Sequence, residues 1–349
     1  MFRARIATSL FAVLALTACD KDKSTTTTTA SNPAANSTAT SVTGAATSKT
    51  DTPTTIAADA GHASETAGSS AAAASKKEPV VTFKTDLSTP ESVFYDDAND
   101  VYIVSNINGK PLDADNNGYI AKLTPDGKVQ TAKWIEGGKN KVTLNAPKGL
   151  AVIADTLYVA DIDTVRMFDR KTGAPTGEVK VPGATFLNDL AATTDGRVLV
   201  SDSGLKAGAK GFDPTGTDAV YSIDKAKKLT TIAKAKDLNG PNGLYSAGDK
   251  IWVASFGSNE LYSLDAKGKK GDVKKLPKGG LDGIVVLPGG DMLGSSWEGN
   301  AVYRGTADGD FKVVIENVKS PADIGYDTKR GRVLVPLFES NEVQAFEIK

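Results

Sequence analysis

The chain has 349 residues, a single cysteine, a single histidine and a formal net charge of −1. Without an excess or a cluster of basic residues, it lacks the charge pattern of a nucleic-acid-binding protein. A single cysteine excludes an internal disulfide, so a folded domain must be stabilised by a hydrophobic core.

The first residues have the pattern of a bacterial lipoprotein signal. Arg3 and Arg5 precede an apolar run over residues 6–16, which is too short to span a bilayer as a mature helix. Small residues follow and lead to Cys19, as in the bacterial lipobox. We therefore predict a signal peptide over residues 1–18, cleavage before Cys19 and lipidation of its thiol. The alternative is an ordinary signal peptide followed by an incidental cysteine.

Residues 19–78 predict a disordered tether. The segment is rich in Ser, Thr and Ala, has no aromatic residue, and contains Val42 and Ile56 as its only branched aliphatic residues. Such a composition cannot bury enough apolar surface to offset the entropy of ordering the chain. His62 lies in this segment, so we do not expect it to act as a ligand or catalyst. The signal and the tether together predict a lipoprotein of the cell envelope, attached to a membrane through its lipid alone and facing the periplasm or the exterior.

Residues 79–349 contain six similar repeats. Each repeat opens with a short motif, and the openings are Pro90-Glu91-Ser92-Val93, Pro147-Lys148-Gly149-Leu150, Leu187-Asn188-Asp189-Leu190, Pro241-Asn242-Gly243-Leu244, Leu281-Asp282-Gly283-Ile284 and Pro321-Ala322-Asp323-Ile324. A turn and a β-rich run follow each opening, and these runs are Val101–Ser105, Leu157–Asp161, Val198–Asp202, Ile251–Ser255, Met292–Ser296 and Val333–Leu337. The predicted third strands are Tyr119–Leu123, Thr164–Phe168, Ala219–Ile223, Glu260–Leu264, Ala301–Arg304 and Glu342–Ile348.

Repeats of this length and pattern predict an all-β protein, a six-bladed β-propeller of four-stranded blades. The sixth repeat ends after its third strand, and an isolated strand at Val80–Lys84 precedes the first repeat. We expect this N-terminal strand to complete the sixth blade and close the ring. A β-solenoid, which needs no such closure, is the alternative.

The repeat geometry brings six side chains together at the mouth of the central channel. In a propeller the first strand of each blade is innermost, so the second residue of each opening motif faces the same end of the channel. The six residues are Glu91, Lys148, Asn188, Asn242, Asp282 and Ala322. Carboxylate and amide oxygens are ligands for a hard cation such as Ca²⁺. Taken singly, Asn or Asp beside Gly is also a common turn sequence.

Two long insertions, Asn106–Gly118 and Ser203–Asp218, separate the second and third strands of the first and third repeats. The topology places both on the face where the ring opens, where they could gate a site. They could equally be simple surface insertions. Within the first, Asp113, Asp115 and Asn117 resemble the start of a calcium loop, but the distant acidic residue of that motif is missing. A polar turn is the favoured interpretation.

These motifs resemble the gluconolactonase and senescence marker protein (regucalcin) family of six-bladed propellers. The resemblance implies that Glu91, Asn242 and Asp282 bind a divalent cation, with Ca²⁺ favoured and other metals open. It also implies that Asn188 contacts the substrate. The sequence departs from the family in its opening motif, which lacks the usual Gly-Pro and Trp, and in Lys148, which adds a cation to the ring. Lys148 could bind substrate, or it could neutralise the carboxylates and take the place of the metal.

The resemblance implies hydrolysis of a lactone or similar ester, with Asp282 helping to deprotonate the attacking water. Residues 79–349 contain no His and no Cys, so hydrolysis there would have to be assisted by a metal or a carboxylate. The alternative is a non-enzymatic propeller, similar to NHL-repeat proteins, that binds a protein, peptide or glycan at the envelope. We expect a monomer with a small-molecule substrate or an envelope ligand and no nucleic-acid partner.

Overall fold

The computed structural model describes residues 77–209 and 211–348. The predicted signal peptide, Cys19 and nearly all of the predicted tether lie outside these residues. Within the described residues, no helix has both the length and the apolar character needed to cross a membrane.

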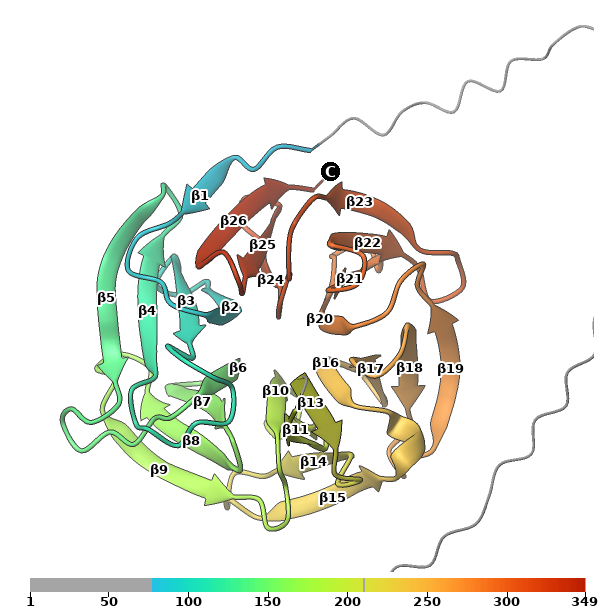
Figure 1. Ribbon diagram of the computed structural model, residues 1–349, viewed down its shortest axis with the longest axis horizontal. Helices are drawn as coiled ribbons and strands as arrows, with labels where there is room; N and C mark the ends of the chain where they lie inside the picture. The colour runs from blue at the N-terminus through green and yellow to red at the C-terminus, as the bar shows by residue number, and fades with distance from the viewer. Residues whose placement is uncertain (1–76, 210, 349) are drawn as a thin grey trace, which may run out of the picture. The chain divides into compact units, whose positions relative to one another are not determined.

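The strands of the described residues form six four-stranded sheets arranged as the blades of a ring, together with one two-stranded hairpin (Figure 1). The prediction of an all-β, six-bladed propeller is confirmed. In the first five blades the chain runs from the innermost to the outermost strand, and neighbouring strands are antiparallel.

The strand bounds follow in chain order. The first blade consists of β2 (Pro90–Asp96), β3 (Val101–Asn106), β4 (Tyr119–Thr124) and β5 (Lys128–Glu136). The second consists of β6 (Pro147–Ile153), β7 (Thr156–Asp161), β8 (Thr164–Asp169) and β9 (Pro175–Lys180). The third consists of β10 (Leu187–Ala192), β11 (Val198–Asp202), β14 (Ala219–Ile223) and β15 (Leu229–Lys234). The fourth consists of β16 (Pro241–Ala247), β17 (Lys250–Ser255), β18 (Glu260–Leu264) and β19 (Lys270–Lys275). The fifth consists of β20 (Leu281–Val286), β21 (Met292–Ser296), β22 (Ala301–Gly305) and β23 (Lys312–Glu316).

The sixth blade joins the two ends of the propeller. It contains β24 (Gly325–Asp327), β25 (Arg332–Leu337) and β26 (Glu342–Glu347), and its outer strand is β1 (Val81–Phe83). Val81 lies opposite Ala345 and Phe83 opposite Val343. The predicted closure strand is therefore confirmed, and it covers the edge that β26 would otherwise expose. All predicted second and third strands agree with the structure to within one residue at each end.

The hydrophobic core is divided among the interfaces between neighbouring blades. Six clusters of buried apolar side chains lie within the described residues, one for each interface of the closed ring. At the interface between the sixth and first blades, Phe83 packs with Tyr102 and Leu334. The ring is thus held by apolar packing at every junction, as expected for a domain without disulfides.

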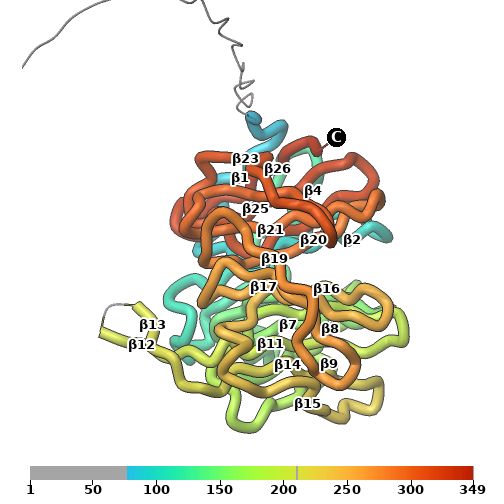
Figure 2. Tube along the Cα trace, turned by 90° about the vertical axis from the view of Figure 1, so that its right-hand side faces the viewer, coloured from blue at the N-terminus to red at the C-terminus, as the bar shows by residue number. Residues whose placement is uncertain are grey.

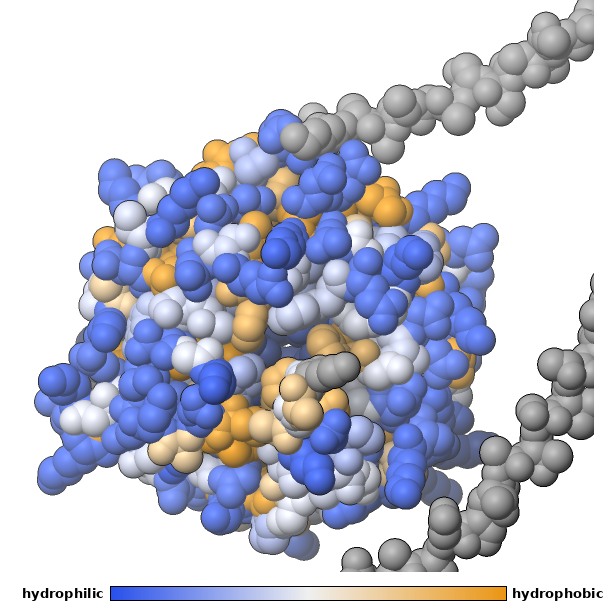
Figure 3. All heavy atoms as spheres, viewed as in Figure 1, coloured by the Kyte–Doolittle hydropathy of each residue, from blue (hydrophilic) through white to orange (hydrophobic). Residues whose placement is uncertain are grey.

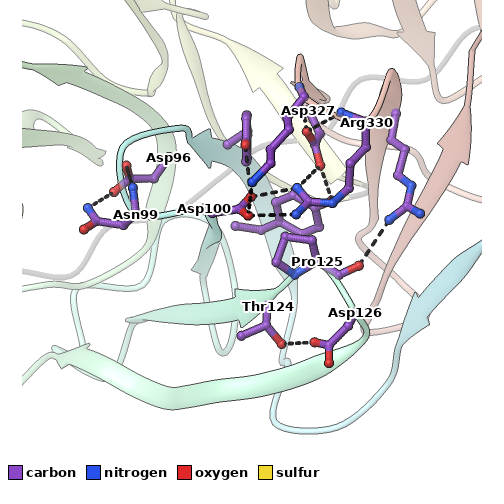
Figure 4. Close-up of polar contacts among 12 residues, drawn as sticks. Asp96, Asn99, Asp100, Thr124, Pro125, Asp126, Asp327 and Arg330 are labelled. Carbon is purple, nitrogen blue, oxygen red and sulfur yellow. Dashed lines mark hydrogen bonds and ion pairs between the residues drawn. The ribbon is translucent and has the colours of Figure 1, made fainter.

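A polar network adds to this last interface, which we call the closure junction (Figure 4). Asp327 is buried, and each of its carboxylate oxygens accepts two hydrogen bonds. Oδ2 accepts from Tyr102 Oη at 2.7 Å and from Arg330 Nη1 at 3.0 Å, while Oδ1 accepts from the backbone N–H groups of Lys329 and Arg330. Arg330 also makes a bidentate pair with Asp100 of the first blade, at 2.7 and 2.8 Å.

The insertion predicted over Ser203–Asp218 contains the hairpin of β12 (Leu205–Gly208) and β13 (Gly211–Pro214). These two strands were not predicted from the sequence. In the side view the hairpin stands out from the face that Figure 1 turns toward the reader (Figure 2). A short 3₁₀ helix, η1 (Lys236–Leu238), follows the third blade.

The innermost strands of the first five blades all contain a bulge at the same place. The pairing with the second strand shifts between the first and fourth residues of each opening motif, as between Pro90 and Val93. A bulge redirects the side chains of the residues it contains, and bulges are frequent beside active sites. The second residue of each motif lies in this bulge, so one local distortion, repeated around the ring, sets the geometry of the channel mouth.

Candidate functional site

Five of the six predicted ring residues line a single cavity of about 200 Å³. These five are Glu91, Lys148, Asn188, Asn242 and Asp282. They come from the innermost strands of five different blades, and all five side chains are buried. Ala322, the sixth position, is buried but does not line the cavity.

The glycines of the opening motifs show whether these motifs are ordinary turns or part of the ring of innermost strands. A Cβ on Gly149 would lie 2.5 Å from Asp189 Cα, and one on Gly243 would lie 2.2 Å from the carbonyl oxygen of Asp282. Neither glycine has a positive φ. They are therefore not turn glycines, and they allow neighbouring innermost strands to approach each other around the channel.

Four ring oxygens have no hydrogen-bond partner among the described residues. They are Glu91 Oε2, Asn188 Oδ1, Asn242 Oδ1 and Asp282 Oδ1. Buried polar atoms are nearly always paired in folded proteins, so an unpaired one calls for an explanation. Four unpaired acceptors around one cavity form an all-oxygen set of the kind that suits a hard divalent cation.

Neighbouring groups fix the orientation of two of these side chains. Asn188 Nδ2 donates to Ser203 Oγ at 3.0 Å, and Ser203 in turn donates to the carbonyl oxygen of Pro241 at 2.8 Å. Trp297 Nε1 donates to Asp282 Oδ2 at 2.8 Å. Asn188 Nδ2 and Asp282 Oδ2 are thus hydrogen-bonded within the protein, whereas Oδ1 of each residue has no partner.

The ring carboxylates are difficult to ionise in the absence of a cation. Burial raises the pKa of Glu91 well above its usual range, and the charges of Asp282 and Asp323 raise it further. Burial and Asp323 likewise raise the pKa of Asp282. A positive ion beside these groups would stabilise their charged forms and lower both pKa values.

Lys148 makes no hydrogen bond to any of the four unpaired ring oxygens. Its Nζ donates to the carbonyl oxygen of Ala146 at 3.0 Å and lies 4.7 Å from the centre of the Phe186 ring. Among the described residues, no ion pair within 4.0 Å joins Lys148 to Glu91 or Asp282. Burial lowers the pKa of Lys148 to about 8, although the charge of Glu91 opposes this shift.

A second polar layer lies one residue further along the opening motifs. Asp189 accepts from the backbone N–H groups of Leu190 and Leu244, both at 2.6 Å, and Asp323 accepts from Ser92 Oγ. Burial raises the pKa of Asp323 to about 7. These carboxylates have donors of their own, unlike the ring oxygens, and they join the innermost strands to one another.

The remaining lining residues form an apolar wall that sequence reasoning did not identify. Ile107, Phe256, Trp297 and Phe338 each follow the last residue of the second strand of a blade. The same register in four of the six repeats is the signal that could have identified them. Because the second strand runs toward the mouth, the residue that follows it lies beside the ring.

Both predicted insertions contribute to this wall, as the topology implied. Pro111 comes from the first insertion, and Leu205 and Phe212 come from the hairpin. The segment that resembles a calcium loop forms a polar turn in which Asn117 Nδ2 donates to Asp115 Oδ2 at 2.6 Å. Within the described residues, no group of three or more His, Cys, Asp or Glu side chains is placed to hold a metal.

Solved structures with the same architecture include several enzymes. A gluconolactonase from Xanthomonas campestris aligns with a TM-score of 0.58 at 20% identity, over 76% of this chain and 88% of that one. A luciferin-regenerating enzyme aligns with a TM-score of 0.57 at 15% identity, over 78% and 96% of the two chains. An inactive variant of virginiamycin B lyase from Staphylococcus aureus, solved with quinupristin, aligns with a TM-score of 0.54 at 14% identity, over 78% and 99%.

No protein-family model and no curated protein sequence matches the chain. At identities this low, the structural similarity establishes the architecture rather than the activity. The chain is therefore a six-bladed β-propeller of the kind found in gluconolactonase and luciferin-regenerating enzyme.

Proposed function

We propose that the protein is a metal-dependent hydrolase of a lactone or related ester, with its reaction centre at the channel mouth. The observation that carries the proposal is the set of four unpaired oxygens on Glu91, Asn188, Asn242 and Asp282. Glu91, Asn242 and Asp282 would hold a divalent cation, Ca²⁺ by preference because the donors are hard oxygens. Asn188 would contact the substrate.

When bound, such a cation would polarise the carbonyl of the substrate and stabilise the negative charge that develops on its oxygen. The protein would supply the proton transfers. Asp282 would take a proton from the attacking water and return it to the alkoxide that leaves when the acyl carbon–oxygen bond breaks. Its Oδ2 is held by Trp297, which fixes the carboxylate against the cavity.

Lys148 would act on the substrate. Its ammonium group donates one hydrogen bond to Ala146 and lines the cavity, so donors remain for a carbonyl or carboxylate oxygen of the substrate. We further propose that the protein works at the cell envelope as a monomer, attached through lipidated Cys19.

The experiment that tests the activity is a hydrolysis assay on a panel of lactones, with the purified protein in Ca²⁺, Mn²⁺, Zn²⁺ or EDTA. We expect turnover that requires a divalent metal and falls at least about a hundredfold in Asp282→Asn. Turnover that persists in EDTA or in Asp282→Asn would contradict the proposal. Metal-dependent binding of a ligand without turnover would instead support the non-enzymatic alternative.

A further inference from the structure

We propose that the substrate carries a compact apolar body, an aromatic ring or a short alkyl chain, beside its reacting carbonyl, and that it is not a polyhydroxylated lactone. This inference rests on the proposed hydrolase function, because it names the substrate class of the same site. It comes from the wall of the cavity rather than from the ring.

Apart from the five ring residues, every residue that lines the cavity is apolar or aromatic. The wall has one side-chain polar group, the Trp297 Nε1–H, and this donor is already bonded to Asp282. A ligand hydroxyl that faced the wall would therefore lose its water and gain no side-chain partner, which disfavours binding. The wall suits groups that need no hydrogen bond.

The aromatic side chains hold one another in place. Trp297 contacts Phe256 with ring centres 5.8 Å apart, and Phe338 with ring centres 5.2 Å apart. Across the cavity lining, Phe186 contacts Phe212 of the hairpin edge-to-face at 5.4 Å. Packed rings of this kind form a stiff surface, which lowers the entropy cost of binding a flat apolar group.

Phe212 is the part of this wall that a ligand would cover. Its side chain is 42% exposed, one of only four large hydrophobic residues so exposed among the described residues. Figure 3 shows apolar residues gathered around the hollow at the centre of the face that bears the hairpin, within a largely hydrophilic surface. An exposed apolar patch beside a cavity is typical of a binding site.

The size of the cavity limits the ligand. Its volume of about 200 Å³ exceeds the ~150 Å³ that accommodates one benzene ring in a protein interior. It is small compared with pockets for drug-sized ligands. One ring fused to a lactone, or a lactone with a short alkyl chain, would fill it.

The test is calorimetric binding of two lactams, which resist hydrolysis, to the full chain with Ca²⁺ present. One probe is a benzo-fused six-membered lactam, and the other is gluconolactam, which has the same ring size and carries hydroxyl groups. We expect the benzo-fused lactam to bind at least about tenfold more tightly. Equal or tighter binding of gluconolactam would overturn the inference.

The wall itself is tested with Phe212→Ser, and Val273→Ser is the matched control. Both positions are exposed, so neither substitution removes a buried core side chain. Val273 is 45% exposed and lies on β19, an outer strand that does not line the cavity. We expect Phe212→Ser to weaken binding of the benzo-fused lactam about tenfold and Val273→Ser to leave it unchanged. Equal effects of the two substitutions would contradict the assigned role of the wall.

These results separate the inference from the proposed function. Preference for the benzo-fused lactam without hydrolysis of the matching lactone would keep the ligand class and reject the hydrolase. Metal-dependent hydrolysis of glucono-δ-lactone in preference to a benzo-fused lactone would keep the hydrolase and reject the apolar substrate.

Discussion

The closure junction and the channel mouth both bury charged groups, but they treat them in opposite ways. At the closure junction, the carboxylate of Asp327 accepts four hydrogen bonds from neighbouring donors. At the channel mouth, Glu91 and Asp282 each leave one buried oxygen without a partner. The first arrangement stabilises the ring, whereas the second costs stability in the absence of a ligand.

The contrast shows where to look for function in a repeated fold. Every blade contributes an innermost strand and an apolar interface, so those features say only that the ring closes. Unpaired acceptors at one end of the channel are not needed for closure. Since they raise the energy of the protein, their presence is best explained by a ligand that pairs with them.

The largest effect is expected at the closure junction. Asp327→Ala should lower the free energy of unfolding by about 3 kcal/mol, because it leaves buried Tyr102 Oη and two backbone N–H groups without their acceptor. Urea denaturation measures the change. Asp126, which pairs with Lys128 on the exposed surface, provides the control, and Asp126→Ala should leave stability almost unchanged. Similar losses of unfolding free energy in Asp327→Ala and Asp126→Ala would contradict the stabilising role assigned to the closure junction.

The buried carboxylates of the channel should make the folded state less stable as pH rises, whereas the Asp327 carboxylate stabilises it. Burial raises the folded-state pKa of Glu91, Asp189, Asp282 and Asp323, the last to about 7. Their contribution to stability is therefore complete below the unfolded pKa of about 4 and is lost as pH rises through the folded pKa. Without metal, stability should fall by about 2 kcal/mol between pH 5 and 8, as measured by urea denaturation. Stability that rises over this window would contradict the raised pKa values.

Trp297 tests whether the orientation of Asp282 matters to the site. Trp297→Phe keeps an aromatic ring between Phe256 and Phe338 but removes the donor to Asp282 Oδ2. We expect Ca²⁺ affinity, measured by calorimetry, to fall about tenfold. Trp134→Phe, in the outer strand β5, is the control and should have no effect. A loss of the same size in both variants would show that Trp297 does not position the carboxylate.

The smallest predicted effect is an increase in the stability of the metal-free protein. Glu91→Gln replaces a buried carboxylate by a neutral isostere and relieves its repulsion with Asp282 and Asp323. The metal-free protein should become about 1 kcal/mol more stable at pH 7, as measured by urea denaturation. Glu316→Gln, on the exposed outer strand β23, should be neutral within about 0.5 kcal/mol. A loss of stability in Glu91→Gln would mean that this carboxylate is paired after all.

Much of the fold could be predicted from the sequence because each blade repeats the same local pattern. Alternation of apolar residues and turn dipeptides located the second and third strands to within a residue, and the missing outer strand of the last blade implied β1. The hairpin β12–β13 was not predicted, since its pattern has no counterpart in the other repeats. The ring positions followed from topology alone.

The apolar wall could be recognised from the sequence only through its register in the repeats, and the hydrogen bonding of the ring side chains could not be predicted at all. Phe256 and Phe338 look like ordinary hydrophobic residues after a strand until the fold places them beside the mouth. The sequence left open whether Lys148 neutralises the carboxylates. Its contacts with Ala146 and Phe186 depend on how the second and third blades meet. Such pairings are decided by tertiary geometry, which no local pattern encodes.

The most direct test of the metal site compares thermal melting of the wild-type chain with that of the double variant Glu91→Gln, Asp282→Asn, each in Ca²⁺ and in EDTA. A ligand that binds only the folded state, at a hundredfold excess over its Kd, adds about 2.7 kcal/mol of stability. We predict a rise of that order for the wild-type chain in Ca²⁺ and none for the double variant. An equal response of the two proteins to Ca²⁺, whether both rise or neither does, would contradict a cation site formed by the unpaired oxygens of the channel mouth.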